Sequence, residues 1–116
     1  MNRIAFEGFD YAPVADFPLL RGAAAAAPEA YVGLIFSSDS FYAARPELIS
    51  RMVDYGVLAV EMEASALYTL AAKWRRRALA ICTVSDHIVT GEETTAQERE
   101  QTFGRMVEVA LSAGLR

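Results

Sequence analysis

Three short runs of consecutive apolar, β-prone residues constrain the fold of this chain more than any other feature. They cover residues 31–36 (YVGLIF), 57–60 (VLAV) and 78–84 (ALAICTV). Because none of them alternates apolar with polar residues, each predicts a strand that is buried on both faces of a sheet. Helix-like segments separate the runs, and this alternation predicts an α/β layered fold.

The intervening segments carry signals for helix ends. Asp16 is a suitable N-cap for a helix that runs through five consecutive alanines and stops at Pro28. Pro46 opens a second helix, for which Gly56 is a suitable C-terminal stop. A third helix, rich in alanine and leucine, is predicted over residues 64–73.

The last helix begins with a capping box. The Thr95 hydroxyl and the Glu98 carboxylate can each accept a hydrogen bond from a free N–H group at the helix start. Apolar residues follow at helical spacing and predict a buried face. That face comprises Phe103, Met106, Val107, Ala110 and Leu111.

The length and the charge bound what the chain can be. With 116 residues, 53% of them hydrophobic, the chain has the size of one domain with a core, residues 1–116, and is not expected to be disordered. The net charge of −4 gives no overall attraction to a nucleic acid polymer. The basic stretch at residues 73–77 (KWRRR) is therefore interpreted as a solvated helix end.

Neither export nor a membrane span is indicated. Cys82 is the only cysteine in the sequence, so an internal disulfide is impossible. No signal peptide is evident at the N-terminus, and no run approaches the ~20 apolar residues that a membrane span needs. We therefore expect a cytoplasmic protein without membrane contact.

Polar and aromatic side chains follow each predicted strand. Asp39 and Phe41 come after the first strand, Glu61 and Glu63 after the second, and Asp86 after the third. Ligands in open α/β sheets bind beyond the carboxyl ends of the strands. We therefore expect these side chains to share one rim and to form a binding site there.

Two carboxylates lie two residues apart in Glu61-Met62-Glu63, and on an extended backbone they would face the same side. A carboxylate accepts hydrogen bonds through both oxygens, so it can hold two neighbouring hydroxyls such as a ribose diol. A metal site is disfavoured, because no histidine or third carboxylate lies nearby in the sequence. A pair of acids that only favours a helix N-terminus is an equally good interpretation.

Asp86 ends the third predicted strand, where partial desolvation would favour its protonated form and make it a candidate general acid. Three contiguous residues, Ser85 to His87, cannot form a hydrolase triad. A structural hydrogen bond is the favoured role of His87. Spacing alone assigns no role to Arg99. Phe41 could either stack on a flat ring or pack into the core.

Four segments, in order along the chain, resemble the bacterial hexameric purine nucleoside phosphorylases. They are residues 36–42 (FSSDSFY), 60–64 (VEMEA), 81–88 (ICTVSDHI) and 94–99 (TTAQER). The resemblance implies a nucleoside-phosphorylase fold, a three-layer αβα sandwich with a mixed sheet. It implies phosphate-dependent cleavage of purine ribo- or deoxyribonucleosides to free base and sugar 1-phosphate, in purine salvage. It implies no cofactor, inorganic phosphate as co-substrate, and a homo-oligomer, which is a hexamer in the family.

The resemblance also implies a role for each matching residue. On the sugar side, Glu63 would hold the ribose 2′- and 3′-hydroxyls with Glu61 beside it, and Met62 would pack against the sugar.

On the base side, Phe41 would stack on the purine and Val60 would line its pocket. Asp86 would donate a proton to purine N7 with help from Arg99, and Ser85 belongs to the substrate-contacting set.

The resemblance covers only the C-terminal half of the family's length, and the other half holds the family's phosphate-binding residues. We therefore expect a base- and ribose-binding half-site in this chain. Two alternatives stay open. One is a non-catalytic remnant that binds purine nucleosides, and the other is a half-subunit that needs a separate N-terminal half to bind phosphate.

Overall fold

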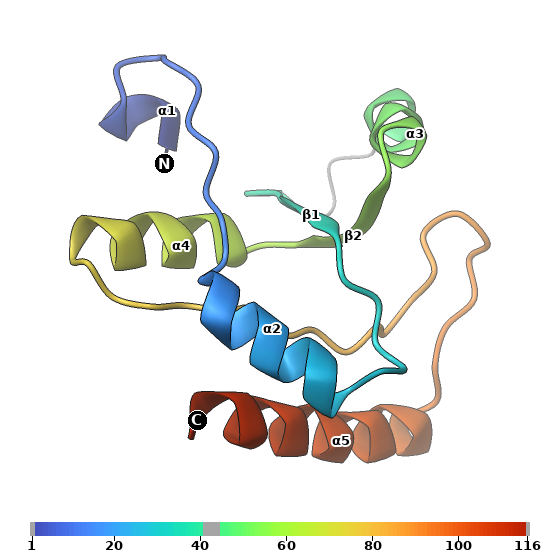
Figure 1. Cartoon of the computed structure of the whole chain (residues 1–116). Helices are drawn as coiled ribbons and strands as arrows, with labels where there is room; N and C mark the ends of the chain where they lie inside the picture. The colour runs from blue at the N-terminus through green and yellow to red at the C-terminus, as the bar shows by residue number, and fades with distance from the viewer. Residues whose placement is uncertain (1, 41–44, 116) are drawn as a thin grey trace. The chain divides into compact units, whose positions relative to one another are not determined.

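The computed structural model describes residues 2–40 and 45–115. The chain divides into two compact units. The first comprises Met1–Asp16 and Tyr31–Leu79, and the second comprises Phe17–Ala30 and Ala80–Arg116. Among the described residues, the first unit holds a two-stranded parallel sheet with its helices, and the second holds a pair of packed helices (Figure 1). The predicted α/β class is therefore confirmed.

The first unit contains helix α1 (Asn2–Ala5), strand β1 (Leu34–Ser37), helix α3 (Pro46–Asp54), strand β2 (Val57–Glu61) and helix α4 (Ala64–Lys73). The two strands run parallel, and α3 lies between them along the chain. Parallel neighbours require such a crossover segment, and their carboxyl ends therefore fall at the same edge of the sheet.

Predicted end signals set the bounds of α3. Pro46 is its first residue, where the missing N–H and the fixed φ are harmless. Gly56 has a φ of +80°, which only glycine adopts without strain, and its N–H donates to the Val53 carbonyl at 2.9 Å. This left-handed residue ends the helix and turns the chain directly into β2.

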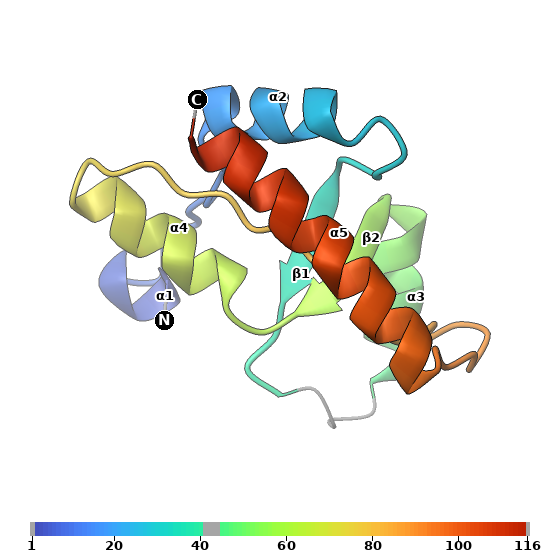
Figure 2. The same cartoon turned by 90° about the horizontal axis from the view of Figure 1, so that it is seen from below.

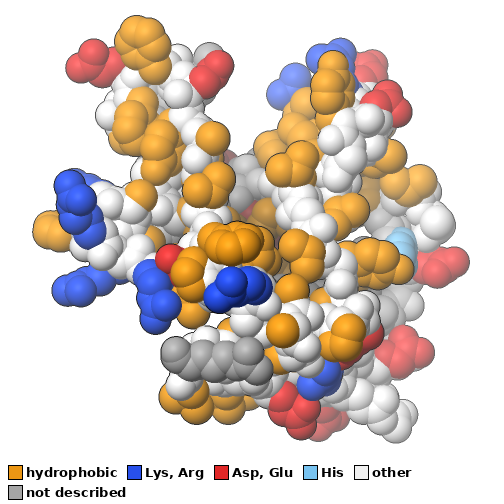
Figure 3. Space-filling model, in the orientation of Figure 1, with side chains coloured by type: hydrophobic (Ala, Val, Ile, Leu, Met, Phe, Trp, Pro, Cys, Tyr) orange, Lys and Arg blue, Asp and Glu red, His pale blue; other side chains and the backbone are white. Residues whose placement is uncertain are grey.

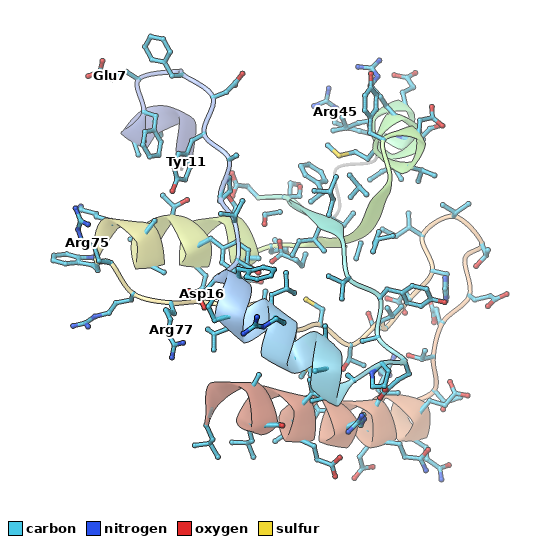
Figure 4. The ribbon with its side chains drawn as sticks, viewed as in Figure 1. Glu7, Tyr11, Asp16, Arg45, Arg75 and Arg77 are labelled. Carbon is cyan, nitrogen blue, oxygen red and sulfur yellow. The ribbon has the colours of Figure 1, made fainter. Side chains whose placement is uncertain are left out.

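Helix α4 has the predicted bounds, and its basic end is solvated as expected. Residues 73–77 are all exposed, and Figure 3 shows Lys and Arg side chains gathered at this end of α4. Figure 4 shows Arg75 and Arg77 pointing away from the ribbon. Arg75 has a φ of +50°, a value that favours glycine, while the Arg76 N–H donates to the Ala71 carbonyl at 2.8 Å.

The second unit consists of α2 (Phe17–Ala26), α5 (Ala96–Gly114) and the segments that flank them. The two helices contact each other (Figure 1). Figure 2 shows that α5 runs obliquely to α2, with the two helices nearest toward the C-terminal end of α5. The side chains buried in this unit are small and include Ala23 and Ala27 on one side and Val109 and Ala113 on the other. Small residues at a contact let two helix backbones approach closely.

Arg105 links α5 to the end of α2 at the surface. Its Nε lies 2.7 Å from Glu29 Oε1, and its Nη2 donates to the Ala26 carbonyl at 2.8 Å. The hydrogen bond from Arg105 lowers the pKa of Glu29. A cation at the last carbonyls of a helix also complements the helix dipole.

The predicted third strand over residues 78–84 is wrong. Among the described residues the sheet contains only β1 and β2, and residues 78–84 form no ladder with a strand. A strand exists only through hydrogen bonds to a neighbour, and an apolar run cannot supply that neighbour itself. The Ala78 carbonyl instead accepts from the Asp16 N–H at 2.9 Å.

The predicted buried face of α5 is also wrong in most of its members. Val109 and Ala113 are buried and Met106 is half-buried, whereas Phe103 is 57% exposed and Leu111 is 57% exposed. The remaining predicted members, Val107 and Ala110, are exposed as well. The small residues of α2 pack against the narrow stripe of α5 that contains Val109 and Ala113. The larger apolar side chains of α5 are exposed. No described helix has the length and apolar character needed to cross a membrane.

Candidate functional site

The carboxyl ends of β1 and β2 meet at one edge of the sheet. Ser37 and Glu61 are the last residues of their strands and are register partners. The Ser38 N–H continues the pairing by donating to the Glu61 carbonyl at 2.8 Å. For these two strand ends, the predicted shared rim is confirmed.

The Glu61 carboxylate is held by the protein itself. Oε1 accepts a hydrogen bond from the Ser37 hydroxyl, and Oε2 accepts from the N–H groups of Glu63 at 2.7 Å and Ala64 at 2.6 Å. The Ser37 Oγ in turn accepts from the Ser65 N–H at 2.9 Å. Two side chains thus cap the free N–H groups at the start of α4.

The same contacts set the ionisation of Glu61. Burial alone would raise the pKa of this carboxyl, but hydrogen bonds from Ser37 and from backbone N–H groups outweigh burial, so the pKa is lowered. Glu61 is therefore held ionised near neutral pH.

Glu63 differs from Glu61 in its exposure and in its hydrogen bonding. The strand ends at Glu61, and Met62 and Glu63 form a bend, so the extended geometry that would place both carboxylates on one side does not reach Glu63. Glu63 is exposed and makes no side-chain capping bond to α4, and its carboxylate accepts no hydrogen bond within residues 2–40 and 45–115. Met62 beside it is 41% exposed. This bend exposes one carboxylate and one thioether to solvent.

A small cavity of about 200 Å³ lies at the same edge of the sheet. It is lined by Pro13, Ile35, Phe36, Ser37, Ala64, Ser65 and Tyr68. Val60 is half-buried in β2, Asp39 is exposed after β1, and Phe41 lies outside the described residues. The serines of this edge, Ser37 and Ser65, were missed by the sequence reasoning. Ser37 directly ends an apolar run, which is a signal for such a position, whereas Ser65 has no such signal.

In the second unit, Ser85 and Asp86 begin a closed loop. Asp86 forms an antiparallel bridge with Glu93, and both the N–H and the hydroxyl of Thr94 donate to the Ser85 carbonyl, at 2.9 and 2.6 Å. Gly91, with a φ of +75°, turns the chain between the two sides. The predicted burial of Asp86 at a strand end is wrong: the residue is exposed, because no strand precedes it.

Arg99 is tied to this loop through Thr94. Its Nη1 donates to the Thr94 carbonyl at 3.1 Å, from the first turn of α5. The Ser85 hydroxyl lies 3.5 Å from Asp86 Oδ2. His87 joins the loop through its backbone, whose N–H donates to the Glu92 carbonyl at 2.7 Å.

The predicted site residues thus form two sets, each gathered within its own unit. Val60 and residues 61–63 belong to the first unit, and Ser85, Asp86 and Arg99 belong to the second. Thr95 and Glu98 form the predicted capping box, which starts α5 four residues before Arg99. Among the described residues, no group of three His, Cys, Asp or Glu side chains could hold a metal ion.

Comparison with known proteins gives a consistent result. A family model described as the phosphorylase superfamily matches residues 5–115. A Brevibacillus brevis relative named purine nucleoside phosphorylase DeoD-type is 56% identical over 118 residues, which cover 98% of this chain and 50% of the relative. A Bacillus cereus relative of the same name is 52% identical over 119 residues, which cover 99% of this chain and 51% of the relative. The chain spans about half the length of the curated relatives it matches.

Proposed function

The chain belongs to the phosphorylase superfamily, and from that membership we propose that it provides the purine- and ribose-binding part of a purine nucleoside phosphorylase. The proposed reaction is phosphate-dependent cleavage of a purine ribo- or deoxyribonucleoside to the free base and sugar 1-phosphate. Such an enzyme is a pentosyltransferase of purine salvage. We place it in the cytoplasm as a homo-oligomer with no cofactor.

One structural observation carries this proposal: the exposed Glu63 carboxylate at the carboxyl ends of two parallel strands. Both of its oxygens are available to accept hydrogen bonds, which matches the two adjacent hydroxyls of a ribose. Met62 supplies an adaptable apolar surface for the sugar, and Glu61 lies beside it. Val60 lines the purine pocket, and Phe41 stacks on the purine ring.

The candidate residues of the second unit act on the purine base. As the glycosidic bond breaks, the purine gains negative charge, and a proton from Asp86 to N7 makes it a better leaving group. Arg99 assists Asp86, and Ser85 contacts the substrate. The Thr94 bonds to Ser85 and Arg99 support this assignment, because they join the two segments through a single residue. The sugar becomes oxocarbenium-like, and phosphate attacks its anomeric carbon.

Calorimetry with inosine tests the ribose assignment directly. Glu63→Ala is expected to weaken inosine binding by about tenfold or more, because it removes a carboxylate that accepts two hydrogen bonds from the ribose. Glu47→Ala, at an exposed glutamate in the first turn of α3, is the matched control for the loss of one negative charge. Absence of binding heat with any purine nucleoside would contradict the proposal.

The half-length match to the relatives favours a second form of the proposal, in which phosphate is bound by residues outside this chain. The test mixes the chain with the N-terminal half of the Brevibacillus brevis relative and follows hypoxanthine release from inosine. Release that requires phosphate and is lost in Asp86→Asn is the expected result. Nucleoside binding with no release in this mixture would favour the non-catalytic remnant.

A further inference from the structure

We propose that the Ser37 hydroxyl and the Glu61 carboxylate act together as a support for the Met62–Glu63 bend, which makes both of them positioning residues for Glu63. This inference rests on the proposed function, in which Glu63 receives the ribose diol. It separates the roles of two carboxylates that the sequence presents as a pair: Glu63 meets the sugar, and Glu61 holds the backbone that carries Glu63.

The hydrogen bonds at Glu61 leave little capacity for a ligand. Three donors reach its carboxylate, namely the Ser37 hydroxyl and the N–H groups of Glu63 and Ala64. A carboxylate offers about four acceptor positions, so most of them are already used. The donor from Glu63 is the decisive one, because it fixes the backbone of the residue that is proposed to bind the diol.

Ser37 anchors this arrangement to the sheet. It lies 24 residues from Glu61 and 28 from Ser65 in the sequence, yet it donates to the first and accepts from the second. The parallel register places Ser37 and Glu61 opposite each other. The start of α4 is therefore held by Ser37 of β1 as well as by Glu61 at the end of β2.

The capping of α4 explains why Glu63 stays available. Glu63 occupies the N-cap position but makes no side-chain capping bond, and glutamate is not among the preferred N-cap residues. Glu61 and Ser37 satisfy the N–H groups that an N-cap side chain would otherwise take. The Glu63 carboxylate is consequently not drawn back onto the helix.

The first readout is amide hydrogen exchange of the full chain at Glu63, Ala64 and Ser65. Ser37→Ala is expected to speed exchange there by about fivefold or more, the effect of losing one hydrogen bond. Ser38→Ala is the matched control, because the hydroxyl of Ser38 bonds to Ser40 within its own loop and to no other part of the chain that the structure describes. Equal exchange in the two variants overturns the inference.

The second readout is the ratio of the dissociation constants for 2′,3′-dideoxyinosine and inosine. Positioning of Glu63 predicts that Ser37→Ala lowers this ratio about fivefold, whereas Ser38→Ala and Ser37→Thr, which keeps a hydroxyl, preserve it. A merely structural role would weaken both nucleosides alike and leave the ratio unchanged, which also overturns the inference.

Failure of the proposed function has a different signature. If the wild-type chain binds neither nucleoside, both the proposed function and the diol-binding role of Glu63 are refuted. Hydrogen exchange still decides whether Ser37 and Glu61 hold the bend, because it needs no ligand.

Discussion

Replacing Gly56 by alanine tests the left-handed turn that connects α3 to β2, the strand that ends at Glu61. Gly56 has a φ of +80°, and a Cβ built on it meets no atom within 4 Å. The expected penalty is therefore purely conformational. A left-handed backbone costs a non-glycine residue about 1–2 kcal/mol of folding free energy. The smaller unfolded-state entropy of alanine offsets about 0.4–1 kcal/mol of this cost. The net loss of unfolding free energy is about 1 kcal/mol.

Urea unfolding is the suitable assay for this loss. The sequence holds one tryptophan, Trp74, which lies at the C-cap of α4 in the same unit as Gly56 and reports on that unit by fluorescence. With an m-value of about 1.5 kcal/mol/M, the midpoint of Gly56→Ala should fall by about 0.7 M urea.

A second glycine provides the matched control. Gly104 lies within α5, and its added Cβ also meets no atom within 4 Å. The same chemical change there should instead stabilise the chain by up to about 1 kcal/mol, because alanine is the better helix former. A Gly56→Ala variant that unfolds at or above the wild-type urea midpoint would refute the conformational reasoning.

Three further predictions follow from helix ends and charges. Arg75→Gly should raise the unfolding free energy by up to about 1 kcal/mol in urea titrations, because it relieves a φ of +50° at the end of α4; an unchanged midpoint would count against this. Thr95→Ala should lower the melting temperature through the loss of about 1 kcal/mol of capping, with Thr102→Ala, inside the same helix, as the comparison. The pKa of Glu61 is lowered in the folded chain, so its stabilisation is complete above the ordinary glutamate pKa and is lost as the pH falls through the lowered value. Glu61→Gln should therefore flatten the acid side of the stability profile, and an unchanged slope would show that Glu61 does not contribute.

Local signals in the sequence predicted most of the element bounds correctly. Pro46 and Gly56 delimit α3, and Thr95 with Glu98 starts α5, because each signal acts through hydrogen bonds or φ values within a few residues. The two shorter apolar runs do contain most of strands β1 and β2. The predicted burial on both faces is wrong, because Leu34 is 61% exposed and Leu58 is 54% exposed. The carboxyl ends of the two strands meet at one edge of the sheet, where Ser37 and Glu61 are register partners.

Two of the errors concern partners that lie far away in the sequence. Residues 78–84 have the composition of a strand but no ladder with β1 or β2. The buried stripe of α5 follows the small residues of α2, about 80 positions earlier in the chain, rather than the largest apolar side chains of α5 itself. Composition and periodicity describe one segment at a time, so they cannot select between possible neighbours.

The sequence by itself determined the α/β class, the helix ends, the family and the identity of the two carboxylates at the end of β2. Only the tertiary structure decided that the Glu61 carboxylate is held by hydrogen bonds at the start of α4 while the Glu63 residue stays exposed. The reason is that Ser37 reaches Glu61 and Ser65 across 24 and 28 residues, through the register of two parallel strands. Because those hydrogen bonds engage Glu61 at the start of α4, Glu63 remains exposed in the bend.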